Sequence, residues 1–150
     1  MTKFEVELNN GLKISSNLKE GDVSSIPNVH PRDIGNGYIW YTLPATEIDQ
    51  LQVVFGLCFF NGELRDINVS ISNPELYGGS WNDFSEAKEK LRAKHTEEWL
   101  VNRGYKVGEF SWGSVWAGYD SKGGFGHAVV RYNSYQAHQK SPAKSAGWTR

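Results

Sequence analysis

The chain has 150 residues, enough for a single domain whose hydrophobic core needs no disulfides. Its 16 Lys and Arg residues nearly balance its 17 Asp and Glu residues, which argues against nucleic acid or a membrane surface as a partner. A single cysteine, Cys58, excludes an internal disulfide and a cysteine-based metal cluster. The first residues carry no secretory signal pattern, so we expect a cytoplasmic protein.

The first expected element is a short hairpin. Val6 and Leu8 alternate with polar residues until the loop at 9–11 interrupts the pattern. A three-residue loop with a left-handed glycine would pair Leu8 with Leu12 and Val6 with Ile14. The alternative, a two-residue turn, would put Leu12 and Ile14 on the face opposite Val6 and Leu8. We expect the three-residue loop.

Residues 15–37 are rich in Gly and Pro, so we expect irregular chain with one short strand near 23–26. The aromatic and β-branched run 38–43 predicts a strand, which Pro44 ends. We expect 45–49 to be a short connection with one helical turn.

The strongest local signal is Asn61-Gly62 between two runs of β-forming residues, because a type I′ turn needs positive φ at both central positions. This turn pairs Phe60 with Glu63, and regular pairing then sets Cys58 opposite Arg65. One face of the hairpin is then expected to hold Val54, Cys58, Phe60, Ile67, Val69 and Ile71. The other face would hold Val53, Phe55, Leu57, Phe59 and Leu64, followed by the polar Asp66, Asn68 and Ser70.

The loop at 73–81 carries Tyr77 and Trp81, which either cover the core or contact a partner. Residues 83–103 then predict the only long helix. Asp83 and Glu86 have capping-box spacing, and Gly104 suits the helix end. At about 100° per residue, one stripe is expected to face the sheet: Phe84, Ala87, Leu91, His95 and Trp99.

Residues 107–133 predict a second hairpin with a turn at 120–123. If Tyr119 pairs with Gly124, one face carries small residues that can accept a helix: Val115, Ala117, Ala128, Val130 and Tyr132. The opposite face gathers Trp112, Ser114, Trp116, Phe125, His127 and Arg131. We therefore expect one α+β domain over 1–132, with an antiparallel sheet of about five to seven strands under one long helix. A polar C-terminal tail is expected over 133–150.

The sequence shows no catalytic motif. Cys58 lies inside an apolar strand, Gly113-Ser114 lacks the rest of a nucleophile elbow, and the four histidines have no metal-ligand spacing. We therefore expect no catalytic residues, no metal and no cofactor, and a binding protein rather than an enzyme.

Two features favour a protein partner. Residues 38–82 hold five acidic residues against one basic residue, a net charge of minus four: Glu47, Asp49, Glu63, Asp66 and Glu75 against Arg65. The chain also has six Trp and seven Tyr residues, the types that anchor protein interfaces.

The runs YIWYTLP, LCFFNGELRDI, WGSVWAGYD and GHAVVRY resemble those of small uncharacterised bacterial cytosolic proteins. In size and element order the chain also resembles the immunity proteins that neutralise bacterial toxins. This resemblance implies a partner-binding surface of Glu63, Asp66, Tyr77 and Trp81 that covers a basic toxin by steric occlusion.

The alternative hypothesis is a small-molecule-binding or hydrolytic site on the aromatic face of the second hairpin. Its residues would be Trp112, Trp116, His127 and Arg131. A genuine pocket there would favour this alternative, and a flat acidic surface rimmed by Tyr77 and Trp81 would favour the protein binder.

Overall fold

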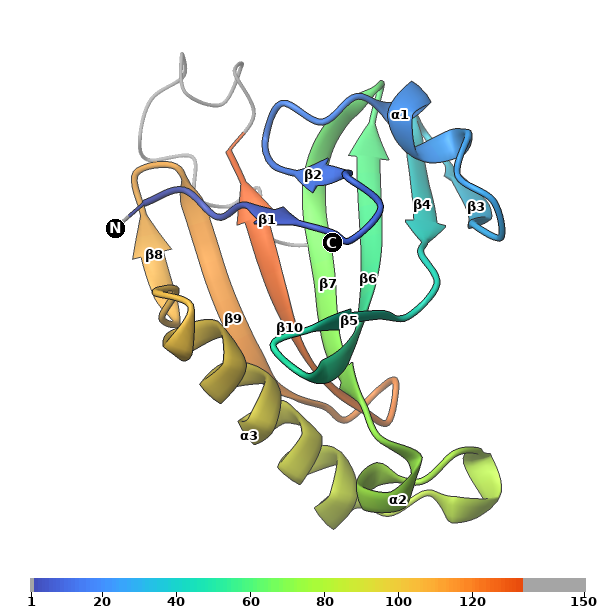
Figure 1. Cartoon of the computed structure of the whole chain (residues 1–150), viewed down its shortest axis with the longest axis vertical. Helices are drawn as coiled ribbons and strands as arrows, with labels where there is room; N and C mark the ends of the chain where they lie inside the picture. Colours follow the sequence, from blue (N-terminus) through green and yellow to red (C-terminus); the bar gives the residue numbers. More distant parts are fainter. Residues whose placement is uncertain (1, 134–150) are drawn as a thin grey trace.

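A computed structural model describes residues 2–133 of the protein (Figure 1). The predicted tail at 133–150 lies outside the described residues except for Asn133, whose backbone N–H donates to Trp112 O at 2.9 Å. Among the described helices, none is long and apolar enough to cross a membrane.

The fold is α+β, as predicted, with an antiparallel sheet and one long helix. Its elements are β1 (Val6–Glu7), β2 (Lys13–Ile14), α1 (Glu20–Ser24), β3 (His30–Gly35), β4 (Tyr38–Thr42), β5 (Thr46–Ile48), β6 (Leu51–Phe60), β7 (Glu63–Ser72), α2 (Pro74–Tyr77), the 3₁₀ turn η1 (Trp81–Asp83), α3 (Glu86–Asn102), β8 (Gly108–Phe110), β9 (Gly113–Asp120) and β10 (Phe125–Tyr132). The main sheet runs in the order β3-β4-β6-β7-β10-β9-β8, and β5 pairs with the start of β6.

The N-terminal hairpin pairs Val6 with Ile14, as the three-residue loop predicts. The main sheet has eight strands, more than the five to seven expected, because three short segments, β3, β5 and β8, form strands that the sequence did not indicate. Residues 15–37 contain α1 and β3, and 45–49 contain β5 rather than a helical turn. Every residue of β3 is exposed at the sheet edge, so no apolar alternation marks it.

The Asn61-Gly62 turn forms with φ of 49° and 87°, and Phe60 pairs with Glu63, both as predicted. The register then shifts, because Arg65 is an extra residue that forms a β-bulge between two pairs. Phe59 lies opposite Leu64, but Cys58 lies opposite Asp66 rather than Arg65.

This bulge corrects the predicted division of faces. One extra residue swaps the faces of everything that follows it in the strand. Ile67, Val69 and Ile71 therefore join the buried face of β6, whereas Asp66, Asn68 and Ser70 lie on the face with Gly56 and Cys58.

The second hairpin forms with Asp120 opposite Phe125, two positions away from the expected register. Gly124, with φ of 67°, closes the turn by donating its N–H to Asp120 O at 2.7 Å. A shift of two positions leaves every side chain on its predicted face, so Ala117 and Ala128 still share the face of small residues. Helix α3 packs on this face.

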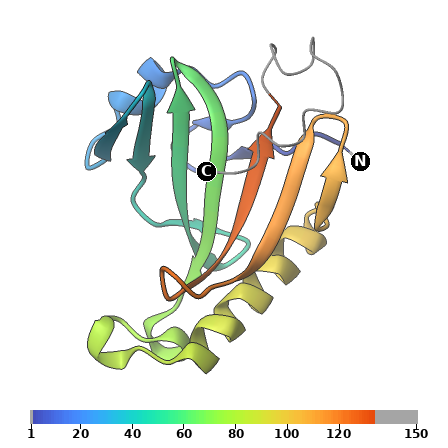
Figure 2. The same ribbon diagram turned by 180° about the vertical axis from the view of Figure 1, so that it is seen from behind.

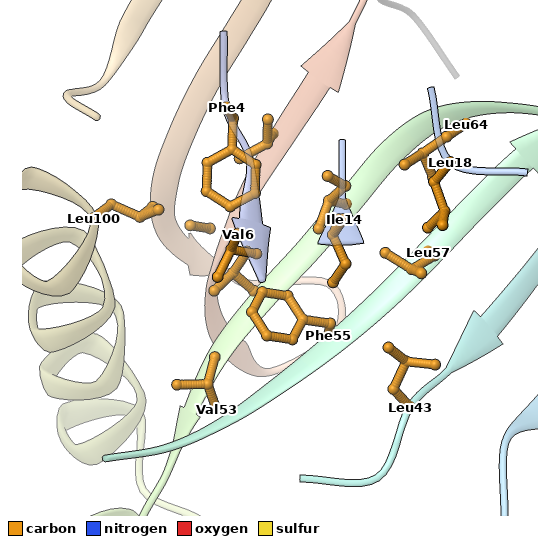
Figure 3. Close-up of a cluster of buried hydrophobic side chains, with 14 of the residues drawn as sticks. Phe4, Val6, Ile14, Leu18, Leu43, Val53, Phe55, Leu57, Leu64 and Leu100 are labelled. Atoms are coloured by element: carbon orange, nitrogen blue, oxygen red, sulfur yellow. The ribbon is translucent and has the colours of Figure 1, made fainter. Parts of the chain in front are cut away.

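One face of the sheet forms the core (Figure 3). The N-terminal hairpin contributes Phe4, Val6 and Ile14, and Phe55 of β6 and Leu100 of α3 lie beside them, all fully or almost fully buried. The helix and the N-terminal hairpin thus cover the same side of the sheet (Figure 1).

The long helix begins at Glu86 rather than at Asp83. Ser85 is the N-cap, and its hydroxyl accepts from Lys88 N–H at 3.3 Å. The carboxylate of Asp83 instead accepts from Gly79 N–H at 3.3 Å, so it is not available to cap the helix. The end is as predicted, with Gly104 at φ of 94°.

The buried stripe of α3 also differs from the prediction. Phe84 lies before the helix and is exposed, Ala87 and Leu91 are exposed, and His95 is half-buried; only Trp99 is buried as expected. The buried stripe consists of Glu89, Ala93, Thr96, Trp99 and Leu100. Polar residues suit this stripe because two of them bond to sheet backbone: Glu89 Oε1 accepts from Gly126 N–H at 3.0 Å, and Thr96 Oγ1 accepts from Ile71 N–H at 3.3 Å.

The second face of the sheet carries Gly56, Asn68, Trp116 and Val129, which alternate with the core positions. No described helix packs against it (Figure 2). We call it the open face.

Candidate functional site

The open face holds a groove of about 800 Å³. Three of the residues predicted for the alternative ligand site line it together: Trp116 of β9 and His127 and Arg131 of β10. Trp112 does not, because it precedes β9 and is buried on the core side, stacked on Phe110 at 5.6 Å between ring centroids.

Strand pairing explains how residues distant in sequence meet at this groove. Trp40 lies opposite Cys58, Cys58 opposite Asp66, Asp66 opposite Arg131, and Arg131 opposite Ser114. This row crosses the sheet from β4 to β9. Trp40 lies at one side of the groove, and Trp116 lies on the next row at the other side.

Trp116 and His127 form an aromatic wall of the groove. The centroid of the His127 ring lies 5.5 Å from that of Trp116, in an edge-to-face arrangement. On its other side His127 contacts Phe125, which lies outside the lining of the groove, with 5.5 Å between the ring centroids. Trp116 remains 44% exposed and therefore presents aromatic surface to the groove, while the His127 ring is partly enclosed.

Burial lowers the pKa of His127, although the charge of Asp120 opposes this effect. The imidazole is therefore neutral at pH 7. Its Nδ1 is enclosed and has no hydrogen-bond partner among residues 2–133. Because no hydrogen bond of the ring is formed within this range, Nε2 is free to bond to a ligand in the groove.

Arg131 and Asp66 form a buried ion pair beside the groove, with Nε and Oδ1 2.6 Å apart. The side chain of Arg131 is 13% exposed and that of Asp66 is 7% exposed. Each of the two side chains thus neutralises the charge of the other beside the groove.

The charges along the groove nearly cancel. Two acidic side chains, Glu109 and Asp120, and two basic ones, Lys122 and Arg131, line it. With His127 neutral, the formal charge of these residues is zero, and the Asp66 carboxylate paired with Arg131 adds one negative charge. The site therefore has no positive field that would attract an anionic ligand.

Trp40 and Asn68 also line the groove and were not predicted from the sequence. Both belong to strands outside the second hairpin, and strand order cannot be read from one hairpin. The alternation of the run 38–43 could have placed Trp40 on the same face as Tyr38 and Thr42. Asn68 was placed on the wrong face because the bulge at Arg65 was not foreseen.

The four residues predicted for a protein partner do not come together. Glu63 is exposed at one end of β7, and Tyr77 follows the other end of this strand, about 30 Å away at the usual rise per residue. Tyr77 is almost fully buried, Asp66 is paired with Arg131, and Trp81 is 74% exposed. Of the two aromatics in this loop, one therefore covers the core and the other points to solvent.

A second hollow, of about 940 Å³, lies on the helix side of the sheet. Its polar groups are already bonded to one another. Tyr77 Oη and His95 Nδ1 lie 2.6 Å apart, and Asp49 accepts from Trp99 Nε1 at 3.1 Å and from Arg103 at 2.8 Å. Burial raises the pKa of Tyr77, so its phenol keeps its proton at neutral pH. This hollow is larger than the open-face groove, and more of the titratable groups that line it are bonded to one another.

Within the part of the chain that the structure describes, no three His, Cys, Asp or Glu side chains are arranged to hold a metal ion. Comparison of the whole chain with protein-family models, curated proteins and solved structures gave no match.

Proposed function

We propose that this protein is a non-catalytic binding protein whose ligand occupies the groove of the open face. The observation that carries this proposal is the convergence of Trp40, Trp116, His127 and Arg131 from three strands on one hollow. Binding sites typically combine aromatic walls with a few polar groups that orient the ligand. The groove has both, and it lies on a rigid sheet.

Binding alone, rather than hydrolysis, is supported by the surroundings of His127. A general base needs a nucleophile or a bound water within reach, and a partner that orients its ring. The nearest buried carboxylate, Asp66, bonds to Arg131, and His127 Nδ1 has no partner between residues 2 and 133. Cys58 is buried within β6 and does not line the groove.

A second candidate function is toxin neutralisation by steric occlusion, which resemblance to immunity proteins suggests. One observation favours it: Trp81 and Phe84 form an exposed aromatic pair with ring centroids 5.6 Å apart. Such aromatics anchor protein interfaces. A cytoplasmic neutraliser of this kind would use the Trp81–Phe84 pair, because Asp66 is bound within the protein.

Saturation-transfer NMR of the full chain with a library of small polar and aromatic fragments tests the first proposal. Trp116→Ala should abolish most fragment hits, because it removes one wall of the groove. Trp81→Ala is the matched control, since it removes an equally large exposed indole from a different surface, and it should retain the hits. Loss of hits in Trp81→Ala alone would reject the groove as the binding site.

The second candidate is tested by affinity purification of the tagged chain from its native cells. A stoichiometric protein partner that is lost with Trp81→Ala but kept with Trp116→Ala would support neutralisation through the Trp81–Phe84 pair. A partner that is lost with Trp116→Ala would instead place protein binding on the open face.

A further inference from the structure

We infer that the ligand of the open-face groove is an uncharged saccharide chain that stacks on Trp40 and Trp116. This inference rests on the proposed binding function and names the class of ligand. It follows from the placement of the two indoles, the polar groups between them and the charge of the groove.

Both indoles lie over glycine. A Cβ on Gly56 would be 3.7 Å from two ring carbons of Trp40, and a Cβ on Gly118 would be 2.9 Å from Cζ2 of Trp116. Each ring thus occupies space that a neighbouring side chain would otherwise fill, and lies along the sheet. Aromatic rings in such positions form platforms for the C–H face of a sugar ring, because the negative face of the π-system attracts polarised C–H groups.

The two platforms are too far apart for one sugar ring. Trp40 belongs to β4 and Trp116 to β9, and three strands separate them in the sheet. At the usual spacing of about 4.8 Å between strands, the platforms are about 19 Å apart along the sheet. A short oligosaccharide spans this distance and can place a ring on each indole.

The polar groups between the platforms suit hydroxyl groups. Asn68 of β7, a strand between the two indoles, lines the groove with an amide, and Ser114 of β9 lines it with a hydroxyl. Neighbouring hydroxyls of a sugar can each donate or accept, so they match an amide that offers both a donor and an acceptor.

The charge of the groove disfavours anionic ligands. Asp66 neutralises Arg131, which leaves Lys122 against Glu109 and Asp120, so a nucleic-acid strand would find no basic track. An isolated phosphate would also have to compete with the buried Asp66 carboxylate for Arg131. A polyhydroxylated, neutral ligand with an apolar ring face is compatible with all of these groups.

Isothermal titration calorimetry of the full chain with linear neutral pentasaccharides, which are long enough to reach both indoles, tests the inference. The probes are cellopentaose, maltopentaose, mannopentaose and penta-N-acetylchitopentaose, with pentagalacturonic acid as the anionic comparison. At least one neutral pentasaccharide should bind more tightly than the anionic one. Trp40→Ala and Trp116→Ala should each weaken this binding by about tenfold or more, and Trp116→Phe should weaken it less because it keeps a ring. Trp81→Ala should leave it unchanged.

The thermal unfolding midpoint of each variant shows whether a loss of binding follows from unfolding. Trp116→Phe keeps an aromatic ring in this position and serves as the folded comparison if Trp116→Ala unfolds. Tighter binding of pentagalacturonic acid than of every neutral probe would overturn the inference. The inference would also be overturned if fragments bound in the groove but no saccharide did, and this outcome would still support the proposed binding function. Failure of both fragments and saccharides to bind at the groove would overturn the two proposals together.

Discussion

At the scale of single residues, Gly126 sets how closely α3 can approach the sheet. A Cβ at this position would lie 1.8 Å from Glu89 O and 3.0 Å from Ala93 N, both in the helix backbone. Backbone atoms cannot rotate away as a side chain does, so any larger residue would push the helix off β10.

Gly126→Ala is therefore expected to lower the free energy of unfolding by at least about 2 kcal/mol, measured by urea denaturation. Gly21→Ala serves as the control, because no atom lies within 4 Å of its hypothetical Cβ and it sits within helix α1. This control should be neutral or slightly stabilising. Equal stability of Gly126→Ala and the wild type would show that the helix does not pack as closely as described.

His127 makes the stability of the protein depend on pH. Burial holds its pKa below the ordinary value of 6.5 in the folded state, so the unfolded chain takes up this proton at a higher pH. The unfolded state therefore binds more protons below that value, and stability falls as the pH decreases through about 6.5. Above this pH, the contribution is constant.

His127→Gln removes this titration, so the variant should lose less stability than the wild type between pH 7.5 and about pH 5. Urea denaturation at both pH values measures the difference, and NMR titration of the imidazole measures the pKa directly. A measured pKa above 6.5 would contradict the burial of this ring.

At the scale of elements, polar contacts attach α3 to the sheet together with the buried Ala93, Trp99 and Leu100. Glu89 accepts from Gly126 N–H and pairs with Arg92, which donates to Ile71 O at 2.7 Å. Arg92 also lies over the rings of Tyr77 and Phe125. The helix thus bonds to β7 and β10 through a nearly buried network.

Glu89→Ala should cost about 3–5 kcal/mol in the free energy of unfolding, because it leaves a buried guanidinium and a backbone N–H without this partner. Glu86 is the matched control: it lies in the same first turn and pairs with Lys90, but this pair is exposed. Glu86→Ala should cost less than about 1 kcal/mol. Similar losses in both variants would show that the Glu89 network contributes little to packing.

The bulge in β7 decides which residues reach the groove. If Arg65 paired with Cys58 in a regular ladder, Asp66 and Asn68 would face the core and Ile67 and Val69 would lie on the open face. The apolar residues change phase between Leu64 and Ile67, and this change was a signal of the bulge that the sequence contained.

Deleting Arg65 should therefore be tolerated, because the pairs on either side of the bulge then follow one another regularly. Deleting Asn68 shifts the rest of β7 by one position and moves Val69 and Ile71 out of the core, at about 1.5–3 kcal/mol for each side chain. Circular dichroism during thermal unfolding should show a cooperative transition for the first variant and none for the second. Loss of folding in both would contradict this account of the bulge.

The strength of local signals explains what the sequence could predict. Asn61-Gly62 favours the positive φ angles of a type I′ turn, and Gly104 tolerates the positive φ angle that ends a helix. The central turn and the helix end were therefore predicted correctly. The start of the helix was predicted wrongly, because Asp83 and Ser85 are both residue types that favour the N-cap position. In the structure Ser85 caps the helix, whereas the Asp83 carboxylate accepts from Gly79 N–H. The position of Trp40 in the groove depends on strand order, which local patterns do not encode.

At the scale of the whole molecule, the sheet separates two hollows of similar size. The hollow on the helix side has polar groups that bond to one another around Asp49 and Tyr77. The groove on the open face has exposed indole surface and an imidazole whose nitrogens have no partner in the described chain. The central claim is that ligands bind at the open face and not on the helix side.

Indole N–H signals in a ¹⁵N-labelled sample of the full chain test this claim most directly. Trp40 and Trp116 line the groove, whereas Trp99 lines the helix-side hollow and donates to Asp49. Single Trp→Phe variants assign the signals, and the tightest fragment or saccharide is then titrated in. We predict that the Trp40 and Trp116 signals shift while the Trp99 signal stays in place. A shift of Trp99 alone would contradict the account and place the ligand between α3 and the sheet.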